Sequence, residues 1–196
     1  MTFTELLEEV YAITNRRDLV IETKSAIKSA TLKAHNTDFR SKDLYEEGIQ
    51  WPTAEFRQSL DYISIVSNFR ALRFLKRVQD EYDETGVPFS IITTDEILDE
   101  YGQMKSDICY VAGRVIEIRS SVAFSKALFS CYVTPIVTEE GYSSWIALLQ
   151  PYAIVFEAAS QVLRMIGEAE KVQFYTQLRN EEYALLTINH TTDQGK

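Results

Sequence analysis

The chain has 196 residues, of which 45% are hydrophobic, and this suits one domain, or one domain with an insertion, that buries a core. Its 20 basic and 29 acidic residues give a net charge of −9, which disfavours binding to nucleic-acid phosphates. The two cysteines lack the number and spacing of a disulfide framework or a zinc site. No signal peptide precedes the first helix and no apolar run approaches the ~20 residues that span a bilayer, so we expect synthesis in the cytosol.

The first 36 residues predict two helices separated by a polar break. Apolar residues recur at helical spacing from position 3 to position 13. Asp18 is expected to cap a longer second helix. That helix carries small residues on its apolar face, among them Ala26 and Ala30, which allow another helix to approach closely.

Residues 37–142 change to short runs of β-branched and aromatic residues separated by turn signals, a pattern typical of strands. Strands are expected at residues 55–62, 69–78, 89–93, 108–111, 115–119 and 128–137. Asp95 is expected to cap one helical turn between the third and fourth of these strands.

The last part of the chain, residues 143–188, predicts a second pair of helices. Ser143 or Ser144 caps the first of them, and Gly167 ends it in the position where glycine is favoured. Another helix begins at Glu168, with acidic residues near its positive end. Residues 189–196 are polar, and we expect them to form a flexible tail.

These elements predict an α+β fold. Each helix pair is too amphipathic to stand alone, so the economical arrangement is one small helical bundle built from residues 1–36 and 143–188. Residues 37–142 would then form an inserted β-rich lobe. The expected core packing of the bundle involves Ala26, Ala30, Trp145, Phe156 and Leu163.

Motifs that carry catalysis or hold a cofactor are missing from the sequence. It contains no glycine-rich phosphate loop, no nucleophile elbow and no His-Glu-x-x-His zinc motif. His35 and His190 lie at opposite ends of the chain, and neither has a sequence signal for an activated serine or cysteine beside it. We therefore predict a protein that is not an enzyme, with no catalytic residue, no metal ligand and no cofactor.

Two clusters of side chains are compatible with a binding function as well as with a structural role. One predicted helical turn carries four carboxylates: Asp95, Glu96, Asp99 and Glu100. They are compatible with a hard-cation site, although a capped, solvated turn is favoured. The β-rich region also interleaves aromatic and basic residues, namely Tyr110, Phe124, Phe129 and Tyr132 with Arg114, Arg119 and Lys126. They are compatible with a stacking platform for single strands, although cross-strand packing is favoured because the chain is acidic.

Several segments carry a resemblance to a known family. They are TLKAH at residues 31–35, DF at 38–39, KDL at 42–44, ICYVAG at 108–113 with IEIRSS at 116–121, SWIA at 144–147, PYAI at 151–154, EAA at 157–159, IG at 166–167 and EEY at 181–183. Together they resemble the head-to-tail adaptor (connector) proteins of tailed bacteriophages. The similarity extends over nearly the whole chain and rests on packing and capping residues rather than on a chemical signature.

The resemblance implies a structural subunit of the virion neck, made in the host cytoplasm. Such subunits form a ring, usually of twelve copies, below the portal protein, where the ring extends the DNA channel and docks the next tail or nozzle protein. DNA passes through without sequence-specific binding, and no membrane is involved. A C-terminal arm reaches the portal, and the residues expected in it are Leu185, Leu186, Thr187, Ile188, Asn189 and His190.

Two alternatives remain open at this point. One is a different ring of the same neck or tail, such as a tail terminator or a nozzle-side connector, which would differ in the purified protein that it binds. The other is a small cytosolic enzyme or regulator with a helical core, which would show an activity or a ligand as a purified monomer.

Overall fold

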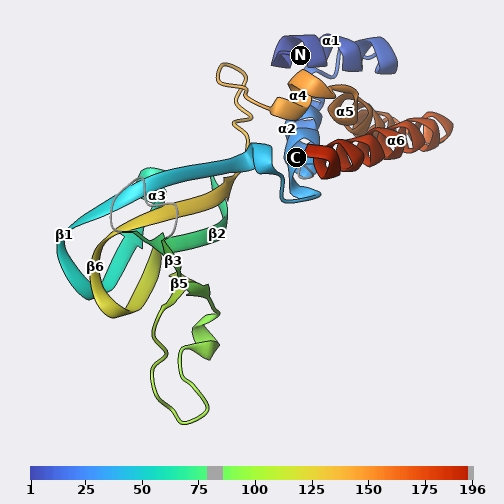
Figure 1. Ribbon diagram of the computed structural model, residues 1–196. Helices are drawn as coiled ribbons and strands as arrows, with labels where there is room; N and C mark the ends of the chain where they lie inside the picture. Colours follow the sequence, from blue (N-terminus) through green and yellow to red (C-terminus); the bar gives the residue numbers. More distant parts are fainter. Residues whose placement is uncertain (79–85, 194–196) are drawn as a thin grey trace. The chain divides into compact units, whose positions relative to one another are not determined.

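The computed structural model describes residues 1–78 and 86–193, with the backbone alone at residues 188–193 (Figure 1). The chain divides into two compact units. The helical unit comprises Met1–Lys42 and Thr134–Lys196, and the β unit comprises Asp43–Val133. Each unit has a buried apolar cluster of its own.

The helical unit contains α1 (Phe3–Thr14), α2 (Val20–Asn36), α4 (Trp145–Leu149), α5 (Tyr152–Met165) and α6 (Ala169–Asp193). Helix α1 starts with a capping box, in which Glu5 donates its backbone N–H to the Thr2 hydroxyl and accepts the Thr2 backbone N–H. It ends at Asn15, whose backbone is left-handed with φ of 54°. Asparagine tolerates that conformation better than most residues, so the chain turns there into α2.

Helix α5 is the central element of the helical unit and contacts α1, α2, α4 and α6. It is apolar around most of its circumference because neighbouring helices cover it on several sides. Its buried residues are Ala153, Ile154, Val155, Glu157, Ala158, Ala159, Ser160, Val162 and Leu163. Alanines of α2 and α5 belong to the same buried cluster, and their small side chains let the two helices pack closely.

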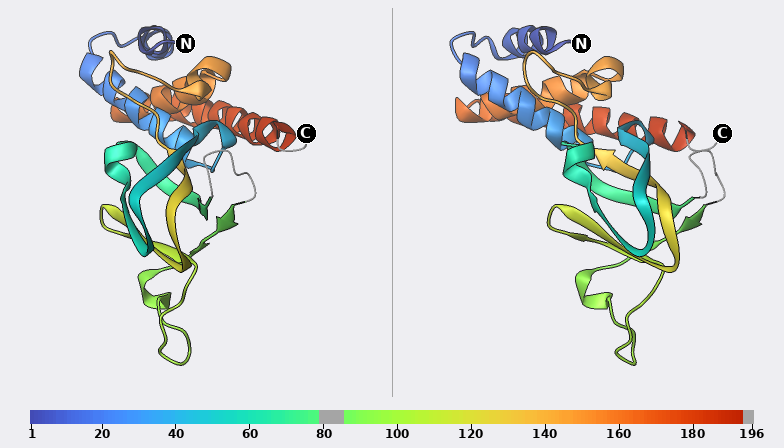
Figure 2. Two further views of the ribbon diagram at one scale, coloured as in Figure 1. Left: turned by 60° about the vertical axis from the view of Figure 1, so that its left-hand side comes forward. Right: turned by 90° about the vertical axis from the view of Figure 1, so that its left-hand side faces the viewer.

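The β unit contains β1 (Leu44–Asp61), β2 (Phe69–Arg77), β3 (Val87–Pro88), β4 (Ser90–Ile91), β5 (Ile108–Ala112) and β6 (Val115–Val133). A short helix, α3 (Tyr62–Ile65), and 3-10 turns at Ser41–Asp43 and Thr94–Glu96 complete it. The strands form one mixed sheet in the order β3-β2-β6-β5-β4, with β1 paired along the other side of β6. The sheet curves into a nearly closed, barrel-like shape (Figures 1 and 2).

Strand β6 is the central strand of this sheet and pairs with three others. Its first half pairs with β5 and its second half with β2, while β1 follows it on the opposite side through both halves. Irregular register in β1 between Gln50 and Arg57 lets the long strands bend, as β-bulges do. Alternate β6 residues, including Ile118 and Phe129, are buried in the β-unit core, so the bend wraps both halves around one cluster.

The predicted fold, a small helical bundle from two helix pairs with an inserted β-rich lobe, is wrong. The structure is α+β, with six helices among the described residues and a six-stranded, nearly closed mixed sheet. The C-terminal part holds three helices because Pro151, which lacks an N–H, separates α4 from α5. Strands β1 and β6 are longer than expected, and the register shifts of β1 hide its alternation from a pattern search, whereas β4 is shorter than expected.

Helix ends differ from the sequence expectation in three places. Leu19, not Asp18, is the N-cap of α2, because the Asp18 carboxylate accepts two hydrogen bonds from the Arg16 guanidinium at 2.8 and 2.7 Å. Thr93 caps the 3-10 turn that was assigned to Asp95. Helix α6 continues to Asp193, so residues 189–193 are helical, and the last three residues of the expected tail lie outside the described part. The predicted caps at Ser144 and Gly167 are confirmed.

Candidate functional site

The predicted arm residues lie on the last turns of α6 rather than on a separate extended segment. Leu185 is exposed over 48% of its surface, whereas Leu186 is only 3% exposed and belongs to the core cluster of the helical unit. Thr187 is exposed and donates its hydroxyl to the Tyr183 carbonyl one turn earlier. Of the remaining arm residues, Ile188, Asn189 and His190, the structure gives the helical backbone.

Helix α4 carries two further exposed apolar side chains. Leu148 and Leu149 are 73% and 64% exposed. They directly precede Gln150, whose side-chain amide donates to the Glu182 carbonyl at 3.2 Å and to its carboxylate at 3.0 Å. Leu185 follows Glu182 by three residues, about one helical turn. We call Leu148, Leu149 and Leu185 the leucine patch, since the Gln150–Glu182 contacts hold their two helices together.

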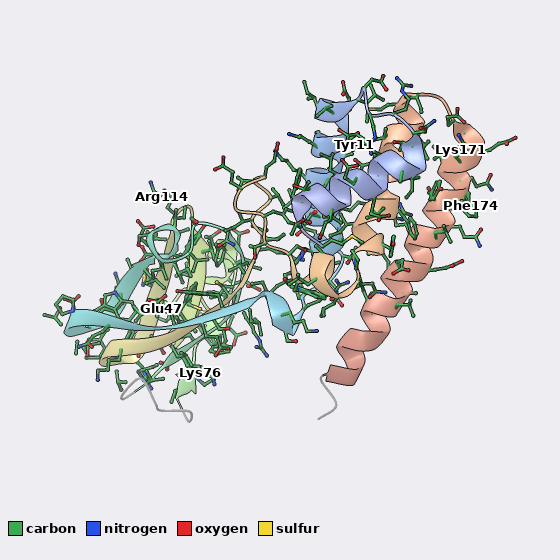
Figure 3. The ribbon with its side chains drawn as sticks, turned by 90° about the horizontal axis from the view of Figure 1, so that it is seen from above. Tyr11, Glu47, Lys76, Arg114, Lys171 and Phe174 are labelled. Atoms are coloured by element: carbon green, nitrogen blue, oxygen red, sulfur yellow. The ribbon has the colours of Figure 1, made fainter. Side chains whose placement is uncertain are left out.

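Four aromatic rings lie between α5 and α6, closer to the start of α6 than Glu182 is. The Phe156 ring stacks on Tyr152 with centroids 5.4 Å apart and meets Tyr175 of α6 at 5.8 Å. Tyr175 in turn contacts Phe174 edge to face at 5.2 Å. Phe174 is exposed and lies near Lys171 on α6 (Figure 3). Such pairs contribute about 0.5–1.5 kcal/mol each beyond burial, and here they fix how α6 lies on α5.

A buried carboxylate fixes α6 more tightly than these rings do. The Glu157 side chain on α5 is 4% exposed and accepts hydrogen bonds from Lys33 at 2.7 Å, Gln161 at 3.0 Å and Arg179 at 2.6 Å. Lys33 comes from α2 and Arg179 from α6, so the carboxylate joins three helices. Burial alone raises the pKa of Glu157, but the hydrogen bonds from these partners outweigh it, and the net pKa is lowered.

Tyr183 belongs to the same region of α6. Its ring lies 5.8 Å from the Arg179 guanidinium and packs against the helical core. Burial, with the negative charge of Glu157, raises the pKa of the Tyr183 hydroxyl to about 12, so the phenol is neutral at neutral pH. Leu185 of the leucine patch therefore lies on a helix, α6, that is held by both a charge network and a packed aromatic ring.

The predicted core residues of the helical unit are found as follows. Ala26, Ala30 and Leu163 are buried, whereas Trp145 and Phe156 are partly buried and pack against the core from its edge. Trp145 meets the His35 ring edge to face at 5.6 Å, and the Arg40 and Lys42 cations lie over its indole at 5.4 and 5.2 Å. Phe156 contacts aromatic rings of both α5 and α6.

Sequence reasoning missed the contact of His35 with Ser144, whose ring nitrogen Nε2 and hydroxyl lie 2.9 Å apart. The two residues are 109 positions apart, so no spacing rule could have found the pair. Both are buried, and the Ser144 hydroxyl also accepts the Ala147 backbone N–H as the cap of α4. The contact therefore joins the end of α2 to the start of α4.

In the β unit, members of the carboxylate cluster and of the aromatic cluster make structural contacts. Glu96 accepts the Thr93 backbone N–H, and Asp99 accepts the backbone N–H groups of Tyr101 and Gln103. Among the described residues, no group of three His, Cys, Asp or Glu side chains is placed to hold a metal ion. Of the proposed stacking aromatics, Phe124 and Phe129 are buried in the β-unit core.

The two cysteines are buried in the β unit as free thiols. Burial raises the pKa of Cys109 to about 12 and that of Cys131 to about 11. Since the thiolate is the reactive form of cysteine, neither side chain is primed for nucleophilic chemistry at neutral pH.

No protein-family model matches this sequence, and no curated protein is found to be similar to it. In the part of the chain that the structure describes, no helix combines the length and apolar character needed to cross a bilayer.

Proposed function

We propose that this chain is a structural head-to-tail adaptor of a phage virion, which forms a ring of twelve copies below the portal and docks the next tail or nozzle protein. The observation that carries the proposal is the leucine patch, three large apolar side chains that are exposed near the contact between Gln150 and Glu182. Exposed apolar clusters of this kind are typical of protein–protein contact sites. The segments that resemble phage adaptors agree with this assignment.

The patch favours binding by a helix rather than by a flexible arm. The Glu157 network and the Tyr183 ring hold α6 in place near Leu186, the last core residue among the side chains that the structure describes. A preformed helix loses less conformational entropy on binding than a disordered tail does. The portal contact would then be a helix face seated in an apolar groove, with Leu185 and the leucines of α4 as anchors.

Binding by one such patch is expected to be weak, because three leucines bury little area. Twelve patches presented by one ring to one portal would bind tightly through multivalency. The net charge of −9 suits the channel of such a ring, since an acidic wall does not retain DNA. The neck of the virion is therefore the proposed location.

The test is co-sedimentation with purified, DNA-filled heads that carry the portal. We expect the full chain to be captured, and Leu149→Ser and Leu185→Ser to reduce capture at least tenfold without shifting the unfolding midpoint. Ile21→Ser is the matched control, because Ile21 is also exposed but lies on α2. Equal capture of all variants would exclude the leucine patch as the portal contact. Capture by purified tail protein but not by heads would favour a tail-side ring.

A further inference from the structure

The β unit carries an exposed apolar tip that no other described part of the unit covers. Residues 92–107 leave the sheet as a long connection between β4 and β5 (Figures 1 and 2). Within it Leu98 and Met104 face each other in a β-bridge, and Tyr101 lies at the turn between them. Leu98, Tyr101 and Met104 are 51%, 80% and 57% exposed. We call these three residues the hairpin tip.

The hairpin tip is an ordered feature. Asp99 N–H donates to the Gln103 carbonyl at 2.8 Å, and the Asp99 carboxylate accepts the N–H groups of Tyr101 at 2.9 Å and Gln103 at 2.7 Å. Gly102 supplies the positive φ of 74° that the turn requires. An apolar ring presented on a preformed turn can enter a pocket at small entropic cost.

The same unit also contains an open pocket of about 550 Å³. Its size lies in the range of ~300–1,000 Å³ typical of sites that enclose small ligands, so a tyrosine side chain fits it. The described lining is Ala54, Arg77, Val78, Gly86, Val87, Val122, Ala123, Phe124, Ser125 and Lys126. This lining combines apolar walls with two cations and includes no carboxylate.

Charge distinguishes the tip from the pocket. The connection of residues 92–107 carries five carboxylates, Asp95, Glu96, Asp99, Glu100 and Asp107, against the single cation Lys105. Glu96, Asp99 and Asp107 are used in contacts within the unit. Asp95 and Glu100 are exposed, and Glu100 lies beside Tyr101, where it can meet an outside partner. In the pocket, Arg77 is occupied by Asp107 at 3.3 Å and Ser120 at 2.5 Å, so Lys126 is the cation available to an incoming carboxylate.

The base of the hairpin is fixed to the pocket wall. The Asp107 carboxylate accepts hydrogen bonds from Arg77, from the Ser120 hydroxyl at 3.4 Å and from the Ser121 N–H at 3.1 Å. One copy therefore presents the acidic apolar tip and the basic pocket in a fixed relation to each other. Two different, complementary surfaces on one rigid unit are what a head-to-tail ring contact requires.

We propose that Tyr101 of one copy inserts into the pocket of a neighbouring copy, with Glu100 meeting Lys126. The occupant is a second copy of this chain, because the tip and the pocket match in charge and size and every copy carries both. The inference rests on the proposed function in that it supplies the contact between neighbouring subunits of the ring.

The experiment is disulfide trapping between copies of the full chain. Tyr101→Cys and Ser125→Cys are placed in separate proteins with different tags, mixed and oxidised; the native cysteines are buried and do not interfere. We expect a mixed dimer that neither variant forms alone. On portal-bearing heads, the double variant should give a ladder of linked subunits. Ile21→Cys with Ser125→Cys is the control and should give none.

Charge reversal adds a second readout. Glu100→Lys and Lys126→Glu, each in the trapping background, should reduce the mixed dimer at least fivefold, and the two reversals together should restore it. Unchanged unfolding midpoints verify that the variants fold. Absence of the mixed dimer in solution and of the ladder on heads, or links between Tyr101→Cys copies alone, would overturn the proposal. Head capture without the ladder leaves the adaptor assignment intact, whereas the mixed dimer without head capture leaves only the self-contact.

Discussion

Arg179 on α6 donates a hydrogen bond of 2.6 Å to the carboxylate of Glu157 on α5, and both side chains are largely buried. The pair lies between the aromatic contact of Phe156 with Tyr175 and the Gln150–Glu182 contact near the leucine patch. The position of α6, and therefore of the proposed portal contact, depends on this ion pair. The first two predictions concern it.

Replacing Arg179 with Met should destabilise the helical unit by about 3 kcal/mol, because it removes the less exposed of the two cations that pair with a buried carboxylate. Lys33, the other cation, is half exposed and compensates only in part. Urea unfolding of both proteins measures the difference. Lys171→Ala on the same helix is the control, since its pair with Glu168 is exposed and should contribute less than about 0.5 kcal/mol. Equal effects of the two substitutions would contradict the assigned role of Arg179.

Stability should fall in acid because of Glu157. Its pKa is lowered in the folded protein from an ordinary value of 4.5, since the hydrogen bonds from Lys33, Gln161 and Arg179 outweigh burial. A lowered folded pKa contributes stability that is present above the unfolded pKa and is lost as the pH falls through the folded pKa. Unfolding midpoints measured between neutral pH and pH values below 4.5 should therefore decrease, and Glu157→Gln should show a shallower decrease. An unchanged acid dependence in Glu157→Gln would rule this out.

Substitutions in α5 should be costly where the side chain is buried or makes ring contacts. Leu163 is fully buried, so Leu163→Ala is expected to cost about 3 kcal/mol, from lost transfer free energy and the cavity left behind. Phe156 is only partly buried but contacts Tyr152 and Tyr175, so Phe156→Ala should cost a similar amount. Met165→Ala on the exposed end of the helix is the control. A loss below about 1 kcal/mol for Phe156→Ala would mean that the ring contacts do not persist in solution.

Local features of the fold could be predicted from the sequence where a single short-range rule applies. Ser144 as a cap, and Gly167 at a positive φ, follow from helix-end chemistry alone. The predictions that failed involve a competing interaction or an irregularity that the linear pattern does not show. Asp18 is lost as a cap because Arg16 takes its carboxylate, and the irregular register of β1 disguises its alternation.

The candidate site was less predictable than the fold. Leu185 was expected in a portal-binding segment, but Leu148 and Leu149 were not among the expected site residues, because their exposure depends on the end of α4 before Pro151. The Gln150–Glu182 contact joins residues 32 positions apart, and the described lining of the pocket comes from separate segments of the folded β unit. No periodicity in a linear sequence encodes either relationship.

The free protein should be mainly monomeric, and rings should form on the portal. Copies with a net charge of −9 repel one another at long range, and a single tip-in-pocket contact buries too little surface to hold a ring alone. Light scattering at micromolar concentration, with and without purified portal, measures this. Stable rings of the isolated protein would contradict the expectation of a template.

Two truncations of α6 that differ by a single residue should differ clearly in stability. Leu186 is buried in the helical core, whereas Thr187 is exposed, so among the residues whose side chains are described Leu186 is the last that belongs to the core. Deleting residues 187–196 should leave the unfolding midpoint nearly unchanged. Deleting residues 186–196 should cost about 2–4 kcal/mol, because a buried leucine is removed. Thermal or urea unfolding of the two truncated proteins tests this one-residue step.

The same pair of truncations tests the portal contact. The shorter deletion keeps the leucine patch but removes the end of the arm, including His190. If residues 187–190 add contacts to a portal groove that Leu185 also enters, the protein without residues 187–196 should stay folded. It should nevertheless lose most of its capture by portal-bearing heads. Full capture would restrict the contact to the leucine patch. Loss of stability already at the shorter deletion would instead mean that the final turns of α6 support the helix, and the loss of capture would then follow from unfolding rather than from a missing contact.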